Sequence, residues 1–155
     1  MHGLLMRARR RQLSCRLLPL RGKLPEQPKR GWLRAFREPL GMSLEAFGAQ
    51  LGVTRQAAHR IEASEANGTI TLNRLREAAD ALGCDVAVVL VPREDLETWV
   101  EGRATKAART KLHPHESALL NDGTPVNPEV LDEAIKREAT RMVDAGDSAI
   151  WAVGR

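Results

Sequence analysis

The sequence predicts a mainly helical protein, with a central bundle of short helices that contains one tight helix-turn-helix, one short β-strand, and flanking helices. Three observations predict this fold. Only five of the 155 residues are aromatic, so the core must consist mostly of Leu, Ala and Val. Between residues 32 and 83 apolar residues recur at helical spacing, separated by Ser, Thr, Gly and Pro, which is typical of capped helices. One β-branched run follows at 86–91.

The distribution of charge and the positions of Pro and Gly residues divide the chain into three parts. Residues 1–30 carry nine Lys or Arg and one Glu, which predicts a basic N-terminal helix and linker. Residues 31–92 are predicted to form the helix-turn-helix domain, which ends in the strand. Residues 93–155 are predicted to be a helical C-terminal extension with a linker at about 113–127. The acidic excess lies in 116–155, with eight acids and four bases, so a polyanion is expected at the basic end.

The first predicted element is an amphipathic helix at about 4–20, whose leucines lie on roughly one side. An Arg-rich, acid-poor start is also typical of a mitochondrial transit peptide or a signal sequence, but no long apolar run or small-residue cleavage site follows. We therefore expect an exposed helix or arm, which is either solvated or adds affinity for phosphates. Pro and Gly residues indicate a linker at 21–30.

Four short helices are predicted in the central part. The first begins at Trp32 and is closed by Pro39 and Gly41. Each of the other three begins after a hydroxyl residue that can cap a helix. Their caps are Ser43, Thr54 and Thr71, and their ends are Gly52, the loop of Asn67 and Gly68, and Gly83.

The strand predicted over 86–91 is short, β-branched and bounded by Pro92. A lone strand cannot satisfy its backbone hydrogen bonds, so it needs a partner strand. The same strand of a second copy is a plausible partner, and we therefore expect a homodimer.

Two more helices are predicted in the C-terminal extension. One begins at Glu94 and continues to about Leu112, and the other covers 128–143 with one apolar stripe. The tail at 150–153 contains Trp151. An amphipathic helix and an aromatic tail beyond a linker more often dock on another molecule than stand alone.

The third central helix carries the candidate nucleic-acid site. Gly52 lets the chain reverse within a tight turn, so the next helix leaves at a steep angle with its outer face free. Arg pairs with guanine and Gln with adenine in the major groove, and small residues allow close approach. The residues expected on this face are Arg55, Gln56, Ala57, His59 and Arg60. Candidate phosphate donors are Ser43, Thr54, Asn67, Thr69 and Asn73. The alternative interpretation is a solvated helix face.

Other classes of protein are not favoured. The chain has no Gly-rich phosphate loop, no G-x-S-x-G and no H-E-x-x-H, so we expect neither catalysis nor a cofactor. Cys15 and Cys84 are isolated, and His113 and His115 have no cysteine nearby, so we expect no disulfide or metal site and a cytoplasmic location. No apolar run reaches the roughly 18 residues that a membrane span needs.

The span 33–86 carries S-x-x-x-F-G at 43–48, L-G-V-T-R at 51–55 and L-x-x-L at 72–75. On these motifs it resembles the phage-repressor-like, or Xre, helix-turn-helix family. The resemblance implies a lambda-repressor-like fold that binds double-stranded DNA. It also implies that Arg37 and Glu62 form a structural ion pair rather than contacts to DNA.

Nearly the whole chain resembles the mobile mystery protein A family, through RGWLRAFREPLGMS at 30–43 and NGTITLNRLREAADALGCDVAVVLVPREDLE at 67–97. Members are encoded on mobile elements beside a Fic-domain partner, which implies a regulator or an antitoxin. Antitoxins that block Fic enzymes often carry [S/T]-x-x-x-E-[G/N]. Here Glu101-Gly102 has Glu97 where Ser or Thr is required.

The sequence therefore supports two hypotheses of function. The first is a sequence-specific, autoregulatory repressor that binds two DNA half-sites as a dimer. The alternative is an antitoxin that restrains a Fic-type enzyme through its C-terminal helix and Trp151, with DNA binding secondary.

Overall fold

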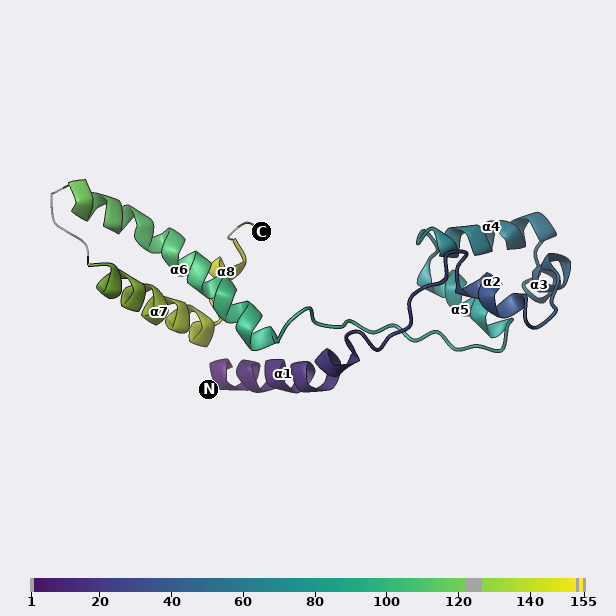
Figure 1. Cartoon of the computed structure of the whole chain (residues 1–155), viewed down its shortest axis with the longest axis horizontal. Coiled ribbons are helices and arrows are strands. Elements are labelled where there is room, and N and C mark those ends of the chain that lie inside the picture. The colour runs from purple at the N-terminus through teal and green to yellow at the C-terminus, as the bar shows by residue number, and fades with distance from the viewer. Residues whose placement is uncertain (1, 122–126, 153, 155) are drawn as a thin grey trace. The chain divides into compact units, whose positions relative to one another are not determined.

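The computed structural model describes residues 2–121, 127–152 and 154. Within these residues it contains eight α-helices and one short 3-10 helix, which confirms the mainly helical class. The chain forms two compact units (Figure 1). The central unit is Leu24–Val89, and the flanking unit combines Met1–Lys23 with Leu90–Arg155. The N-terminal helix thus belongs to the same unit as the C-terminal extension, whereas the sequence suggested two separate parts.

The central unit contains the four predicted helices, and three of them begin at the expected caps. The helices are α2 (Trp32–Arg37), α3 (Leu44–Gln50), α4 (Arg55–Ala66) and α5 (Leu72–Asp80). The hydroxyls of Ser43, Thr54 and Thr71 each accept a hydrogen bond from the backbone N–H three residues later, at 3.1, 3.2 and 3.3 Å. Each bond satisfies a donor that would otherwise have no partner at the start of its helix.

Helix α4 packs on all three other helices of the central unit. The core between them has Phe47, Ala58 and Ala78 completely buried, together with Leu33 and Ile61. Because one side of α4 is committed to this core, the opposite side is held toward solvent.

The strand predicted over 86–91 is not confirmed. Residues 84–92 belong to no helix, and no β-strand occurs among the residues that the structure describes. The β-branched run supplies strand propensity, but a ladder also needs a second backbone, and the described chain offers none. Val88 and Leu90 are 57% and 85% exposed.

The flanking unit consists of α1 (His2–Leu17), the 3-10 helix η1 (Leu18–Leu20), α6 (Leu96–Asn121), α7 (Pro128–Ala145) and α8 (Ala149–Ala152). Helices α6 and α7 lie side by side, with α8 against α6 (Figure 1). Ala104 and Ala108 of α6 are completely buried against Met142 and Ile135 of α7. The apolar stripe of the last helix, which the sequence suggested as a docking surface, therefore mostly lies inside this unit.

Helix α6 is longer than the sequence predicted. It passes the expected end at Leu112 and includes Pro114 before it ends at Asn121, so the predicted linker at 113–127 is wrong over 113–121. A proline removes one backbone hydrogen bond, but the Glu, Ala and Leu residues that follow favour helix and allow it to continue. The rest of that linker, 122–126, lies outside the described residues.

Candidate nucleic-acid interface

The turn between α3 and α4 depends on two glycines. Gly52 has a φ of +65°, which side-chain-bearing residues rarely adopt. A Cβ added to Gly48 would lie 2.7 Å from the carbonyl oxygen of Val53. The backbone N–H of Val53 donates to the carbonyl of Gly48 at 2.8 Å. The turn therefore packs directly against Gly48 of α3, and this contact fixes the direction of α4 relative to α3.

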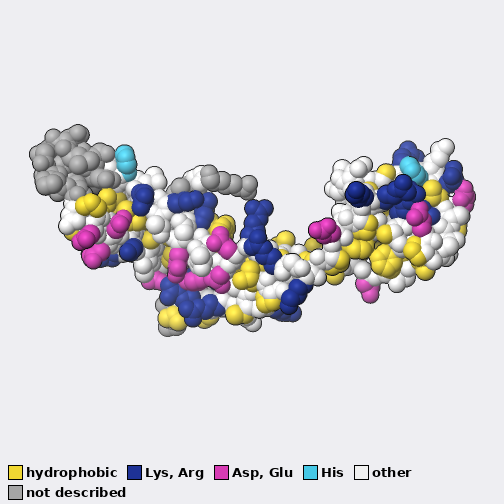
Figure 2. All heavy atoms as spheres, in the orientation of Figure 1, with side chains coloured by type: hydrophobic (Ala, Val, Ile, Leu, Met, Phe, Trp, Pro, Cys, Tyr) yellow, Lys and Arg dark blue, Asp and Glu magenta, His cyan; other side chains and the backbone are white. Residues whose placement is uncertain are grey.

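Helix α4 has two clearly different faces. Ala58, Ile61, Glu62 and Glu65 recur at helical spacing and are buried. The opposite face carries exposed polar side chains, which line an open hollow of about 490 Å³ beside Leu44. These side chains are Arg55, Gln56, His59 and Arg60, all predicted for this face. Figure 2 shows basic side chains gathered around a histidine on one face of the central unit.

One acidic residue lies within this basic surface. The Arg55 Nε lies 2.6 Å from Oε1 of Glu45, and both side chains are more than 60% exposed. Hydrogen bonds from the backbone N–H of Glu45 itself and from Ser43, with the charge of Arg55, hold the pKa of the Glu45 carboxyl below its ordinary value. Glu45 is therefore ionised at neutral pH and partly neutralises Arg55.

The predicted phosphate contacts fall into two groups along α4. Ser43 and Thr54 are exposed at the starts of α3 and α4, where their hydroxyl oxygens accept backbone bonds. The hydroxyl proton of Thr54 remains available to donate, whereas that of Ser43 is donated to the Glu45 carboxylate. Asn67 and Thr69 follow the opposite end of α4, roughly 18 Å away along a helix of this length. Ala57, by contrast, is half-buried between the exposed residues of α4.

Two of the more distant candidates already have partners. The hydroxyl of Thr69 donates to the carbonyl of Ser64 at 3.3 Å, so its proton is engaged within the loop. Asn73, in the first turn of α5, accepts a bond from Arg76 at 3.4 Å and keeps its amide group exposed. Asn67 is exposed at the C-terminal end of α4.

The ion pair between Arg37 and Glu62, implied by the family resemblance, is present. Both residues are buried, and Arg37 also donates to the carbonyl of Met42 at 2.8 Å. The hydrogen bonds that Arg37 donates to the Glu62 carboxylate raise the pKa of the Arg37 guanidinium. This pair joins α2 to α4, so neither residue is available to a ligand.

Sequence reasoning missed two acidic residues that shape the site. Glu45 looks like an ordinary acid in the first turn of a helix, and only the folded turn brings Arg55 to it. Glu65 is buried, and its carboxylate accepts bonds from the Leu33 backbone N–H at 3.3 Å and from Gln27 Nε2 at 2.8 Å. The position of Glu65 on the same helical stripe as Ala58 was a signal that could have identified it as buried.

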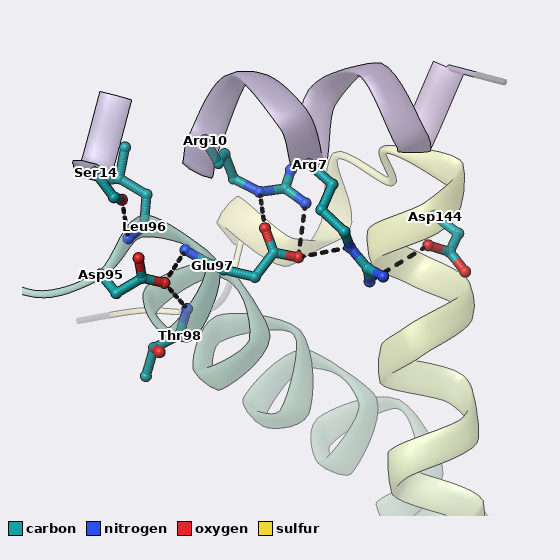
Figure 3. Close-up of polar contacts among 8 residues, drawn as sticks. All are labelled: Arg7, Arg10, Ser14, Asp95, Leu96, Glu97, Thr98 and Asp144. Atoms are coloured by element: carbon teal, nitrogen blue, oxygen red, sulfur yellow. Dashed lines mark hydrogen bonds and ion pairs between the residues drawn. The ribbon is translucent and has the colours of Figure 1, made fainter. Parts of the chain in front are cut away.

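Two of the N-terminal arginines make contacts within the flanking unit (Figure 3). Arg7 and Arg10 hold the carboxylate of Glu97, with Nε–O distances of 2.9 and 2.8 Å. The hydroxyl of Ser14, which is only 3% exposed, accepts the backbone N–H of Leu96 at 3.0 Å. Helix α1 is therefore attached to the start of α6 instead of extending as a free arm.

Three further arginines of α1 are exposed, namely Arg9, Arg11 and Arg16. Leu13, which the sequence placed in an apolar stripe, is 48% exposed, so the packing face of α1 is the one that carries Ser14. The exposed arginines are the part of the predicted basic arm that a polyanion could still reach.

A short helix, a glycine-dependent turn and a second helix with a polar outer face define a helix-turn-helix domain, a class that inserts its second helix into the DNA major groove. Residues 33–89 match a protein-family model described as helix-turn-helix. The chain therefore contains an Xre-type helix-turn-helix domain over these residues. No curated protein and no solved structure matched the chain.

In the described part of the chain, the His, Cys, Asp and Glu residues form no group that would hold a metal ion. None of its helices is long and apolar enough to cross a membrane.

Proposed function

We propose that the protein is a sequence-specific DNA-binding regulator of the Xre type that represses its own gene. The observation that carries this proposal is the outer face of α4. Arg55, Gln56, His59 and Arg60 are all exposed there, around one hollow, on the side opposite the buried core. Their side chains can donate to guanine and adenine edges, and the hollow leaves room for bases to approach.

The other polar residues position the domain on the duplex. Thr54 is suited to donate its hydroxyl proton to a phosphate beside the groove, close to the N-terminal end of α4, and Ser43 can do so once it exchanges its bond to Glu45. Asn67, Thr69 and Asn73 would reach phosphates near the other end of that helix. Thr69 must first exchange its bond to Ser64 for one to a phosphate, so we expect it to contribute least.

We also propose that two copies pair through residues 86–91. This segment has no partner in the described chain, and its apolar side chains Val88 and Leu90 are exposed. An antiparallel pair would satisfy both backbones and cover these side chains. A symmetric dimer would then bind two half-sites about one helical turn of DNA apart.

The proposed DNA site is tested with the full chain and the DNA upstream of its own gene. We expect binding that weakens steeply with salt. Replacing Arg55 and Gln56 with Ala should abolish preference for that DNA over competitor DNA and leave weak binding, because each bidentate base contact is worth about 1–3 kcal/mol. Arg137, exposed on α7, gives the matched control R137A. Unchanged preference in the double variant would contradict the assignment of α4.

The proposed dimer is tested separately. Replacing both Val88 and Leu90 with Lys would bring like charges together across the pair and remove no buried contact within the chain, because both side chains are exposed. Sedimentation should show a dimer for the parent chain and a monomer for the variant. A dimer that survives these changes would have to use another surface.

The alternative function, an antitoxin that restrains a Fic-type enzyme, is favoured by one observation. Trp99 and Trp151 are both largely exposed on the flanking unit. Deleting the C-terminal residues would be a poor test, because α7 contributes four of the nine buried residues in the core of this unit. The sharper test replaces Trp151 with Ala and measures inhibition of a Fic-domain protein encoded beside this gene, if there is one.

A further inference from the structure

The flanking unit carries an aromatic surface that DNA binding does not use. The rings of Trp99 on α6 and Trp151 on α8 have centroids 5.3 Å apart, and the side chains are 44% and 51% exposed. The guanidinium carbon of Arg103 lies 5.9 Å from the centre of the Trp151 ring. Three large side chains that could each be solvated separately are thus held together at the surface.

This surface continues into a groove along the start of α6. The groove has a volume of about 790 Å³, and Leu96, Trp99 and Gly102 are among the residues that line it. Trp99 and Arg103 belong both to the groove and to the aromatic cluster, so the two form one surface. All these residues lie within the flanking unit.

Gly102 keeps the middle of the groove open. It lies inside α6, where glycine weakens a helix, and a Cβ placed on it would meet nothing within 4 Å. No packing contact within the unit requires glycine at this position. The missing side chain leaves space between Trp99 and Lys106, one turn to either side, for a group from another molecule.

The charge of the groove indicates the chemistry of that molecule. Three cations line it, Arg93, Arg103 and Lys106, against one acid, Glu94. Tryptophan and arginine are the residues that most often dominate binding energy at protein interfaces, where an apolar anchor fills a pocket surrounded by polar contacts. An acidic partner would complement the basic rim.

We propose that this groove binds an acidic segment of a partner protein, which inserts an apolar side chain over Gly102 beside Trp99. The basic rim then pairs with carboxylates on either side of the anchor. This inference depends neither on DNA binding by the central unit nor on the identity of the partner.

The three tryptophans of the chain supply the test. The indole N–H groups of Trp32, Trp99 and Trp151 give three signals in nitrogen-labelled full-length protein, and Trp32 serves as an internal control because it lies in the central unit. The probe is a synthetic peptide with Glu residues around a central Leu-Phe pair. We expect it to shift the signals of Trp99 and Trp151 and to leave that of Trp32 unchanged.

Three variants identify the surface. Replacing both Arg93 and Lys106 with Glu should lower the affinity for the peptide about tenfold or more, because it removes two of the three cations. Gly102→Leu should fill the groove and abolish the shifts of both signals. Arg137→Glu, which reverses one charge at an exposed position of α7, should leave affinity unchanged, and circular dichroism establishes that each variant is folded.

Four outcomes would overturn the proposal. The first is no shift with the acidic peptide, and the second is an equal shift with a peptide in which Lys replaces every Glu. The third is a shift on concentrating the chain alone, which would make a second copy the occupant. The fourth is that indole-3-acetate shifts the signals of Trp99 and Trp151 as much as the acidic peptide does, and that the groove variants abolish this shift. That result would indicate a small-molecule site.

Discussion

Glu45 is the residue whose charge most directly opposes the proposed function of α4. Its carboxylate is 2.6 Å from the Arg55 guanidinium, next to the groove-facing residues. On DNA, Arg55 would contact a base edge in a groove bounded by phosphates, and Glu45 both competes for Arg55 and repels those phosphates. An exposed pair of this kind contributes little to folding, so its effect should fall on binding.

We expect Glu45→Gln to bind DNA more tightly at low salt without a change in thermal stability. Removing a negative charge beside the phosphates should also steepen the dependence of log affinity on log salt. Fluorescence anisotropy across a salt series measures this slope. The matched control is Glu133→Gln on α7, which removes the same charge from the flanking unit. An equal gain in both variants would mean that only net charge matters.

Gly48 is the residue on which the geometry of the turn depends most directly. A Cβ there would lie 2.7 Å from the Val53 carbonyl oxygen, so Gly48→Ala must displace the turn. We expect a loss of about 1–3 kcal/mol in the free energy of unfolding, as for other overpacked sites, and weaker DNA binding. Urea unfolding measures the change.

Gly102→Ala is the matched control, since it is the same substitution in a helix with open space. It should stabilise α6 by roughly 0.5–1 kcal/mol. If both alanines stabilised the protein, the close contact at Gly48 would be wrong.

At the scale of elements, helix α1 depends on polar contacts more than on an apolar face. The bonds from Arg10, and after them the charge and hydrogen bond of Arg7, hold the pKa of the Glu97 carboxyl below its ordinary 4.5. A lowered pKa in the folded state means that Glu97 stabilises the protein above its ordinary pKa. This contribution is lost as pH falls through 4.5 and below.

We expect Glu97→Gln to weaken the attachment of α1 at neutral pH by about 2 kcal/mol, because bonds to a charged group are lost. The variant should also lose less stability than the parent chain when the pH is lowered. Some acid sensitivity should remain, because Arg141 and Lys111 lower the pKa of Glu138 to about 2 in the same unit. Trypsin should cleave the variant faster within α1. Cleavage as slow as in the parent chain would show that Glu97 does not hold α1.

The elements that the sequence predicted well are those set by local signals. The caps Ser43, Thr54 and Thr71 and the two faces of α4 depend on residues within one turn of each other. The attachment of α1 joins Ser14 to Leu96, far apart in the chain, and no local pattern indicates it. The leucine pattern placed Leu13 on the apolar side of the helix, but the structure exposes Leu13 and buries Ser14, because a polar partner at the start of α6 decides which face packs.

At the scale of the molecule, the chain holds two units with separate cores. All the residues proposed to contact DNA lie in the central unit, and the aromatic groove lies in the flanking unit. Two connections join them, since the chain leaves the flanking unit after Lys23 and returns to it at Leu90. Binding to DNA and binding to a protein can therefore be separated by cutting the chain at these connections.

We expect a fragment of residues 24–92 to fold alone and to retain the DNA sequence preference of the full chain. A second fragment, 32–92, should be less stable because it lacks Gln27, whose amide bonds the buried Glu65 carboxylate at 2.8 Å. Leaving that oxygen without its partner costs roughly 1–3 kcal/mol. Thermal unfolding of both fragments measures the difference, and Gln27→Ala in the longer fragment separates the lost bond from the lost length. Equal stability of the two fragments would show that the central unit begins at α2, and that residues 24–31 contribute nothing to its fold.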